Sequence, residues 1–118
     1  MPDERKVISI VFYRTLSGVE PVREWLLSLS SEDRRTIGID LMKVEYGWPI
    51  GMPVCRSLGQ GIWEVRSTLS TGRIARVLFC IVDGEMYLLN GFIKKTQKTP
   101  QNELALARAR QLEVLRHE

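Results

Sequence analysis

The sequence predicts an α+β domain in which helices precede a hairpin-linked sheet rather than alternate with its strands. Two segments between residues 21 and 47 carry apolar side chains three and four positions apart, which is typical of amphipathic helices. Strand-like runs follow between residues 62 and 93, separated by short turns, and a last helical pattern begins near residue 100. Because strands joined by short turns pair antiparallel, we expect a meander of three or four strands, packed against helices.

The N-terminal half predicts one strand and a helical hairpin. The β-branched run at residues 7–12 predicts the strand. Pro21 suits the first position of a helix, and Val22 opens an apolar stripe that continues at helical spacing. Ser30 is placed to cap a second helix, which we expect to end near Gly47.

Two features of this half leave room for interpretation. Four polar residues of the second helix predict a solvated face: Arg34, Arg35, Asp40 and Glu45. Residues 48–53 form a stiff apolar loop, which is either a buried plug beneath the sheet or the wall of a substrate groove.

The strand segments contain arginines. A short strand over residues 54–58 precedes the strand at residues 62–66, in which Glu64 and Arg66 point to the same face. Trp63 points to the other face, where a core position is the expected role and base stacking the alternative.

The strand at residues 73–80 is apolar on both faces, as expected for a central strand. Strict alternation puts Arg73 on the face opposite Arg76, although Arg73 begins the strand and can turn either way. A cation within a strand is costly to bury unless an anion accompanies it, and a phosphate backbone is one such anion.

The C-terminal part predicts a hairpin and a helix. Asp83 and Gly84 are typical of a two-residue type I′ turn, which leads into a strand over residues 86–93. Thr99 and Pro100 predict an N-cap and a first helical residue. The expected inward face of that helix consists of Leu104, Ala105, Leu112 and Leu115.

Composition and charge restrict the function classes. At 118 residues with 44% apolar content, residues 1–118 are expected to form a single domain. The net charge of +3 is unevenly spread, because residues 56–98 carry seven Lys and Arg against three Asp and Glu. This distribution favours an anion site on the strands over a generally basic surface.

Metal and membrane chemistry are not expected. Cys55 and Cys80 are in no metal-binding motif, and His117 is the one histidine, so we predict no cofactor and no metal site. No apolar run reaches the roughly 18 residues of a membrane span, and the expected location is the cytoplasm.

Several strings together resemble one protein family. They are VFYR at residues 11–14, PVREWL at 21–26, EYGWPIGMP at 45–53, WEVR at 63–66, RIARVLF at 73–79 and LLNGFIKKTQKTP at 88–100. In this order and spacing the chain resembles the phage-derived, HigB-like branch of the RelE/ParE toxin superfamily, from about residue 7 to residue 112. The resemblance implies a RelE-like fold.

The resemblance also implies a function and partners. RelE-like toxins of type II toxin–antitoxin pairs cleave messenger RNA, usually on the ribosome, and are held inactive by an antitoxin, which for HigB-like toxins is typically a helix-turn-helix protein. ParE-like members share the fold but block DNA gyrase, so a non-catalytic inhibitor is the second hypothesis. A nucleic-acid-binding module without toxicity is the third.

Cleavage by attack of a 2′-hydroxyl needs a base, an acid and cations that stabilise the phosphorane-like transition state. We predict Arg66, Arg76, Lys94 and Lys95 as catalytic residues, with the arginines on phosphate and a lysine as the acid or base. The alternative for each arginine is a structural salt bridge to a helix carboxylate.

A second group is predicted to bind RNA: Arg73, Lys98, Gln97 and Glu64. Glu64 is also a competing base candidate, although an ion pair with Arg66 is the more ordinary use of it. Relative to the family, Phe79 stands where many members have tyrosine, and Asn90 where some have histidine. Without a histidine base, we expect slow chemistry that depends on the ribosome to position the RNA.

Overall fold

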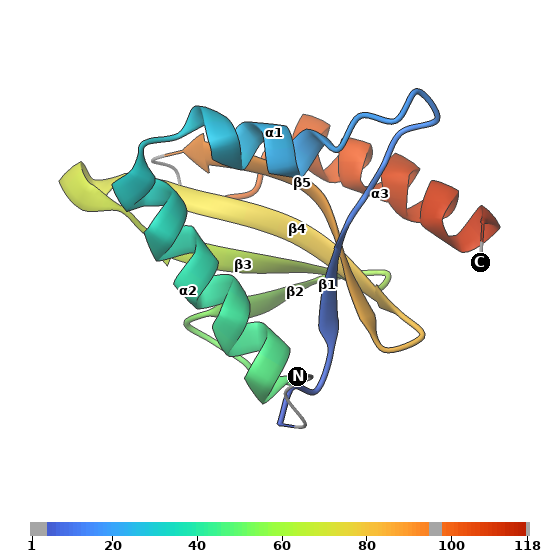
Figure 1. Ribbon diagram of the computed structural model, residues 1–118, viewed down its shortest axis with the longest axis horizontal. Coiled ribbons are helices and arrows are strands. Elements are labelled where there is room, and N and C mark those ends of the chain that lie inside the picture. The colour runs from blue at the N-terminus through green and yellow to red at the C-terminus, as the bar shows by residue number, and fades with distance from the viewer. Residues whose placement is uncertain (1–4, 95–97, 118) are drawn as a thin grey trace.

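The computed structural model describes residues 5–94 and 98–117, and within them the chain forms one sheet with helices on both faces (Figure 1). The sheet has the order β1-β5-β4-β3-β2. Its strands are β1 (Ser9–Phe12), β2 (Cys55–Gly59), β3 (Ile62–Thr68), β4 (Ile74–Val82) and β5 (Glu85–Lys94). Strands β2 to β5 form the predicted antiparallel meander, while β1 pairs in parallel with β5, a pairing that the sequence pattern did not indicate.

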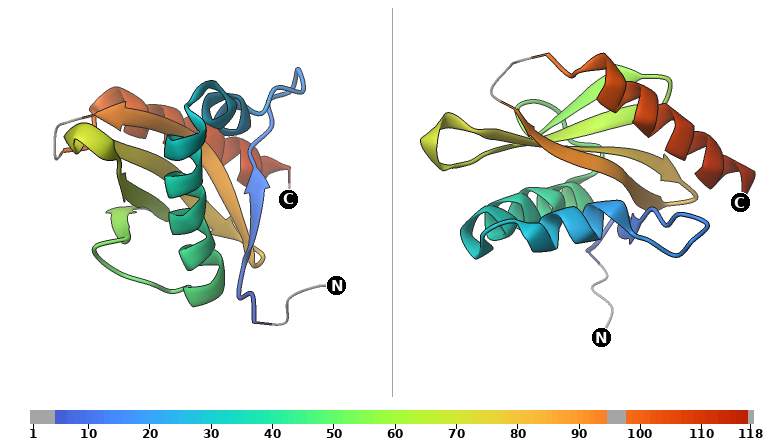
Figure 2. Two further views of the ribbon diagram at one scale, coloured as in Figure 1. Left: turned by 60° about the vertical axis from the view of Figure 1, so that its left-hand side comes forward. Right: turned by 90° about the horizontal axis from the view of Figure 1, so that it is seen from above.

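Helices α1 (Pro21–Ser28) and α2 (Ser31–Gly47) cover one face of the sheet, and α3 (Gln101–Arg116) covers the other (Figure 2). The α+β prediction is therefore confirmed, with a RelE-like layout of strand, two helices, antiparallel strands and a final helix.

The predicted starts of the first two helices are confirmed. Pro21 is the first residue of α1. The Ser30 hydroxyl accepts a hydrogen bond from the Asp33 N–H at 3.1 Å and caps α2, which ends at Gly47. Both devices satisfy or remove backbone N–H groups that a helix leaves without partners in its first turn.

Of the four residues predicted to form a solvated face of α2, Arg35 is exposed, Arg34 and Asp40 are half-buried, and Glu45 is buried. Glu45 is buried, and its carboxylate accepts hydrogen bonds from the Ile10 N–H at 3.0 Å and forms an ion pair with Lys6 at 2.9 Å. Arg34 donates to the Leu29 carbonyl at 3.3 Å and is half-buried. Glu45 thus connects α2 to β1, and Arg34 connects α2 to the segment between α1 and α2. The helical spacing of apolar residues does not predict such contacts.

The core between the sheet and α1–α2 is apolar. Its fully buried members include Val22, Ile37, Val44, Val65, Val77, Phe79 and Leu88. Trp25 of α1 lies so close to Gly91 of β5 that a Cβ at this position would overlap the indole ring. The absence of a side chain at Gly91 is therefore what lets α1 approach the sheet.

The apolar loop after α2, at residues 48–53, packs two of its side chains into the core and leaves others exposed. Trp48 packs edge-on against Trp63 at 4.9 Å between ring centroids, and Ile50 joins the same core. Pro49 and Met52 are exposed. Trp63 is accordingly a core residue, as expected.

The hairpin prediction at residues 83 and 84 is confirmed. Asp83 and Gly84 both have positive φ, 51° and 76°, as a type I′ turn requires, and they join β4 to β5.

The predicted inward face of α3 is wrong at three of its four positions. The helix packs through Leu104, Ala107 and Val114, whereas Ala105 is exposed and Leu112 and Leu115 are 58% and 51% exposed. Ala107 is completely buried, and its small side chain allows the close approach to the sheet that sets the orientation of the helix. None of the helices in the described ranges is long and apolar enough to cross a membrane.

Candidate functional site

Three neighbouring strands place arginines on one face of the sheet, the face that α3 covers in part. Arg56 on β2 lies directly opposite Glu64 on β3, and Arg66 on β3 lies directly opposite Arg76 on β4. Because side chains alternate between the faces of a strand, all four belong to the same face. We call these four residues the strand cluster.

The centre of the strand cluster is a buried ion pair. Arg76 Nε lies 3.2 Å from Glu64 Oε1, and both side chains are 0% exposed. Arg76 also donates from Nη1 to the Lys98 carbonyl at 3.1 Å. Burial lowers the pKa of the Arg76 guanidinium, Glu64 opposes this shift, and the charges of Arg66 and Arg56 add to it.

Glu64 joins the strand cluster to the segment before α3. Its Oε2 accepts a hydrogen bond from the Thr99 hydroxyl at 2.6 Å. The predicted N-cap role of Thr99 is wrong for this reason, and Pro100 occupies the cap position without a side-chain bond. A buried carboxylate is costly to leave without hydrogen-bond donors, and the Thr99 hydroxyl supplies one to Glu64 Oε2.

Arg66 and Arg56 make up the accessible part of the strand cluster. Arg66 Nε lies 3.7 Å from Glu64 Oε1, as expected, and its side chain is 18% exposed. Arg56 is exposed. Sequence reasoning did not single out Arg56, although its place opposite Glu64 follows once the strand at residues 54–58 is paired with the next one.

The lysines lie at the end of the last strand. Lys94 is the final residue of β5 and is exposed, and Lys98 is exposed just before α3. Ile74, two residues before Arg76 on the same face, pairs with Lys94, so Lys94 lies close to the strand cluster along the sheet. Lys95 and Gln97, also predicted to act on RNA, lie outside the described residues.

Arg73 does not join the strand cluster. Its guanidinium makes two hydrogen bonds to Asp33 of α2, at 2.9 Å and 3.1 Å, on the opposite face of the sheet. Strict alternation therefore holds for Arg73. The structure contains a salt bridge from Arg73 to a helix carboxylate, the structural role considered above as the alternative for Arg66 and Arg76.

Phe79 and Asn90, the two positions at which the family resemblance implied other residue types, have structural roles. Phe79 is fully buried on the α1–α2 face, 5.7 Å from the Trp48 ring, and points away from the strand cluster. Asn90 donates from Nδ2 to the Glu103 carboxylate at 3.0 Å and to its carbonyl at 3.2 Å, beneath α3. Across residues 5–94 and 98–117 no group of three or more His, Cys, Asp and Glu is arranged to hold a metal ion.

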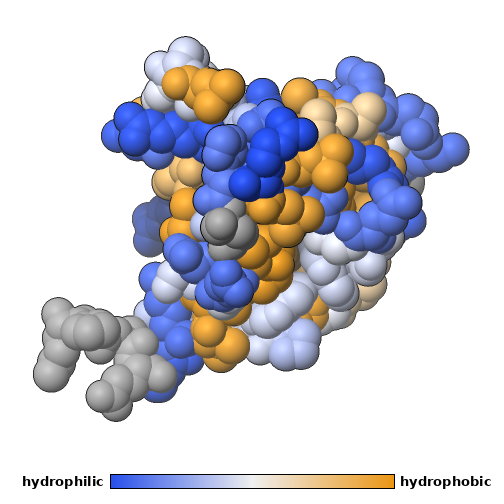
Figure 3. All heavy atoms as spheres, turned by 90° about the vertical axis from the view of Figure 1, so that its right-hand side faces the viewer, coloured by the Kyte–Doolittle hydropathy of each residue, from blue (hydrophilic) through white to orange (hydrophobic). Residues whose placement is uncertain are grey.

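A hollow of about 720 Å³ lies at the other end of β5, far from Lys94 along this strand. Phe12, Tyr13 and Tyr87 line it together with Glu113 and Val114 of α3. Figure 3 shows this side of the molecule, with an apolar band between charged side chains. The basic residues among those that line it in the described part of the chain are Arg14 and His117, and neither belongs to the strand cluster, so the hollow is a separate feature.

The layout of the elements and the strand cluster define a RelE-like α+β protein. The family model described as phage-derived protein Gp49-like (DUF891) matches residues 24–112, and the chain belongs to this family. The family is part of the RelE/HigB-like toxin group. No curated protein matches the chain.

Proposed function

We propose that this protein is the HigB-like toxin of a type II toxin–antitoxin pair and that it cleaves messenger RNA on the ribosome, with a helix-turn-helix antitoxin as its inhibitor. Membership of the Gp49-like family supports the toxin role. The observation that carries the nuclease role is the pair of accessible arginines, Arg56 and Arg66, on adjacent strands and one face. Guanidinium groups so placed can hold one phosphate through several charge-assisted hydrogen bonds.

The proposal divides the work within the strand cluster. Arg66 and Arg56 hold the scissile phosphate and stabilise its transition state. Glu64 orients Arg66, and Arg76 holds Glu64 in place through the buried ion pair. In this conformation Arg76 has no exposed surface with which to touch phosphate, so the catalytic contact predicted for it stays a prediction.

Proton transfer falls to a lysine in this proposal. Glu64 is a poor base candidate because it is 0% exposed and already accepts from Thr99. Lys94 and Lys98 are exposed near the strand cluster, and a lysine amine is one of the groups that can transfer a proton to or from a reacting oxygen. A lysine base is less well matched to neutral pH than histidine, so positioning by the ribosome supplies much of the rate.

Primer extension on cellular messenger RNA after brief induction tests the nuclease role. We expect cuts at defined codon positions with the wild type and with Arg35→Ala, a control at an exposed arginine of α2. Arg66→Ala is expected to reduce cutting by about 10²–10³-fold, as loss of one transition-state donor does. Arg66→Lys separates loss of charge from loss of the guanidinium fork, and circular dichroism checks the fold of each variant.

A second candidate function is a non-catalytic, ParE-like inhibitor of gyrase or another target. The full burial of Arg76 and Glu64 favours it, since an ion pair sealed beneath α3 is equally suited to a purely structural role. Growth arrest with intact transcripts, in the wild type and in Arg66→Ala alike, would establish this function and exclude the nuclease.

A further inference from the structure

Helix α2 carries a second apolar stripe, on the side that faces away from the sheet. Its inward stripe consists of the buried residues Ile37, Leu41 and Val44. On the outside, Ile39, Met42 and Tyr46 are 43%, 49% and 37% exposed. Their spacing of three and four residues puts them on one side of the helix, roughly opposite the inward stripe at about 100° per residue. We call these three residues the outer stripe.

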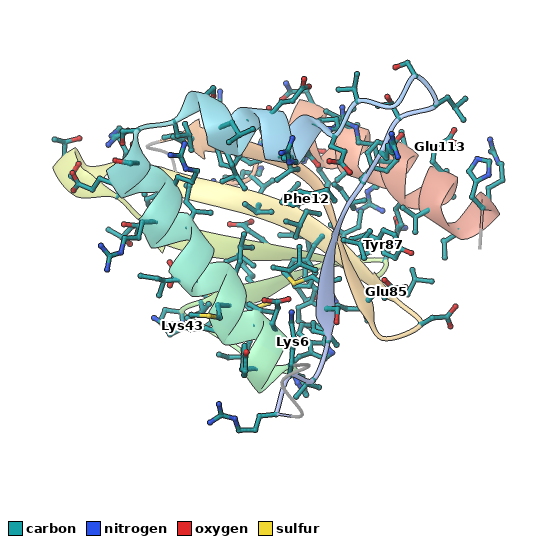
Figure 4. All side chains as sticks on the ribbon, viewed as in Figure 1. Lys6, Phe12, Lys43, Glu85, Tyr87 and Glu113 are labelled. Carbon is teal, nitrogen blue, oxygen red and sulfur yellow. The ribbon has the colours of Figure 1, made fainter. Side chains whose placement is uncertain are left out.

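The outer stripe is bordered by cations. Ile39, Met42 and Tyr46 line a shallow depression of about 710 Å³ together with Arg5 and Lys43, and among the residues that the structure describes none in this lining is acidic. Figure 4 shows Lys43 directed outward from α2.

A smaller depression, of about 420 Å³, adjoins the first one. It shares Ile39 and Lys43 with it and adds Arg66 and Asp40. Asp40 forms an ion pair with Lys43 at 3.3 Å, so it offsets one cation of this surface. Among the described residues of the two linings, three cations, Arg5, Lys43 and Arg66, accompany one carboxylate, and Arg66 also pairs with Glu64 of the strand cluster.

Gly38 lies beside the outer stripe and has no role in the packing of its own chain. It is exposed, it has no positive φ, and a Cβ at this position would meet no atom within 4 Å. Glycine weakens the interior of a helix relative to alanine. Because Gly38 has no side chain, it leaves a flat spot on the helix surface where the backbone of another protein can come close.

We propose that the outer stripe of α2, with Gly38 at its edge, docks an amphipathic α-helix of a partner protein whose apolar face is flanked by Asp and Glu. Apolar side chains at helical spacing suit a helix laid along the groove, and Arg5 and Lys43 pair with its acidic flanks. A two-fold contact with a second copy of this chain is unfavourable, because it would bring these cations against each other. The identification of this partner with the antitoxin rests on the proposed function.

A pair of synthetic helices tests the inference on the full chain. One 18-residue amphipathic peptide has leucines along one face and glutamates beside them, and its twin has lysines in place of the glutamates. Titration into the ¹⁵N-labelled protein is expected to shift the amide signals of residues 38–46, with a dissociation constant for the acidic peptide at least tenfold below that of the basic twin.

Gly38→Gln is the decisive variant, because glutamine favours the helix and fills the flat spot. We expect it to weaken binding of the acidic peptide at least tenfold while the midpoint of thermal unfolding stays the same or rises. Leu112→Gln, at an exposed leucine of α3, is the matched control and should bind as the wild type does.

The inference is overturned by equal binding of the two peptides, by no binding of the acidic one, or by a Gly38→Gln variant that binds normally. Concentration-dependent shifts at residues 38–46 without peptide would also overturn it, in favour of self-association. These readouts do not require RNA cleavage, so a chain that cuts no messenger RNA would refute the proposed nuclease and leave this inference standing.

Discussion

The two faces of the sheet differ in what they bury. The face under α1 and α2 is filled mostly by apolar side chains such as Val65, Val77 and Phe79, and its two ion pairs, Arg73–Asp33 and Lys6–Glu45, keep their cations 32% and 35% exposed. The face under α3 buries Glu64 and Arg76 side by side at 0% exposure, next to apolar neighbours. Apolar residues of similar volume would often give equal or greater stability than a buried ion pair. The difference indicates that the α1–α2 face serves folding, while the α3 face has a chemical composition that stability alone does not require.

The largest expected effect comes from breaking the buried pair on the α3 face. Glu64→Ala leaves the Arg76 charge buried without its carboxylate and Thr99 without its acceptor. We expect the free energy of unfolding to fall by about 3–5 kcal/mol, as measured by urea denaturation.

A double variant sharpens this comparison between faces. Glu64→Leu combined with Arg76→Met makes the α3 face apolar like the other one, and it should recover most of the loss because no charge remains unpaired. Glu113→Ala, at a partly exposed ion pair of α3, is the control and should change stability by less than about 1 kcal/mol. A Glu64→Ala variant as stable as the wild type would show that the pair has no such role.

The next effect concerns the apolar face, through the contact between α1 and β5. Gly91→Ala forces the Trp25 ring away from the sheet. Overpacking of this kind typically costs about 1–3 kcal/mol, and the environment of Trp25 should change with it. Thermal unfolding and tryptophan fluorescence measure the two consequences. Gly51→Ala is the control and should change neither, since Gly51 has no positive φ and a Cβ at this position meets nothing within 4 Å.

A smaller effect is expected at Arg73, the arginine that points to α2. Its side chain is 32% exposed, but the buried Asp33 would lose two hydrogen bonds, so Arg73→Ala should lower stability by about 1–2 kcal/mol. If the α3 face alone handles RNA, this variant keeps the cleavage pattern of the wild type in primer extension. Loss of cleavage in a folded Arg73→Ala variant would remove the functional distinction between the faces.

The smallest effect depends on pH and involves one thiol from each face. Burial raises the pKa of Cys55 and of Cys80 from 9.0 to about 11. Near pH 9 the unfolded chain loses these protons and the folded chain keeps them, so stability falls as pH rises. From pH 7 to pH 9 the loss in free energy of unfolding should be about 0.4 kcal/mol greater for the wild type than for Cys80→Ala; an equal loss in both would mean that Cys80 is not shielded.

Much of the fold was predictable because local signals agreed with the tertiary structure. Pro21, Ser30 and the Asp83–Gly84 turn have mechanisms that operate within a few residues, and each is confirmed. The face of α3 was not predictable in the same way. Leu112 and Leu115 fit an apolar stripe, but the close approach at Ala107 decided the orientation of the helix.

For the candidate site, the sequence predicted which face of the sheet each side chain points to, but not how deeply each side chain is buried. Alternation placed Glu64 with Arg66 and set Arg73 against Arg76, and the structure agrees on both counts. The burial of Arg76 depends on the segment before α3, whose Thr99 hydroxyl and Lys98 carbonyl bond to Glu64 and Arg76. Such contacts join residues more than twenty positions apart, and no local pattern encodes them.

The parallel pairing of β1 with β5 has a consequence for how this protein is made. Ser9 aligns with Glu85, so the first strand has no partner until most of the chain has left the ribosome. Pairing over such a sequence separation is slow compared with helix formation, because a long loop must close first. The edge of the sheet that β1 forms can therefore be completed only after β5 has been synthesised.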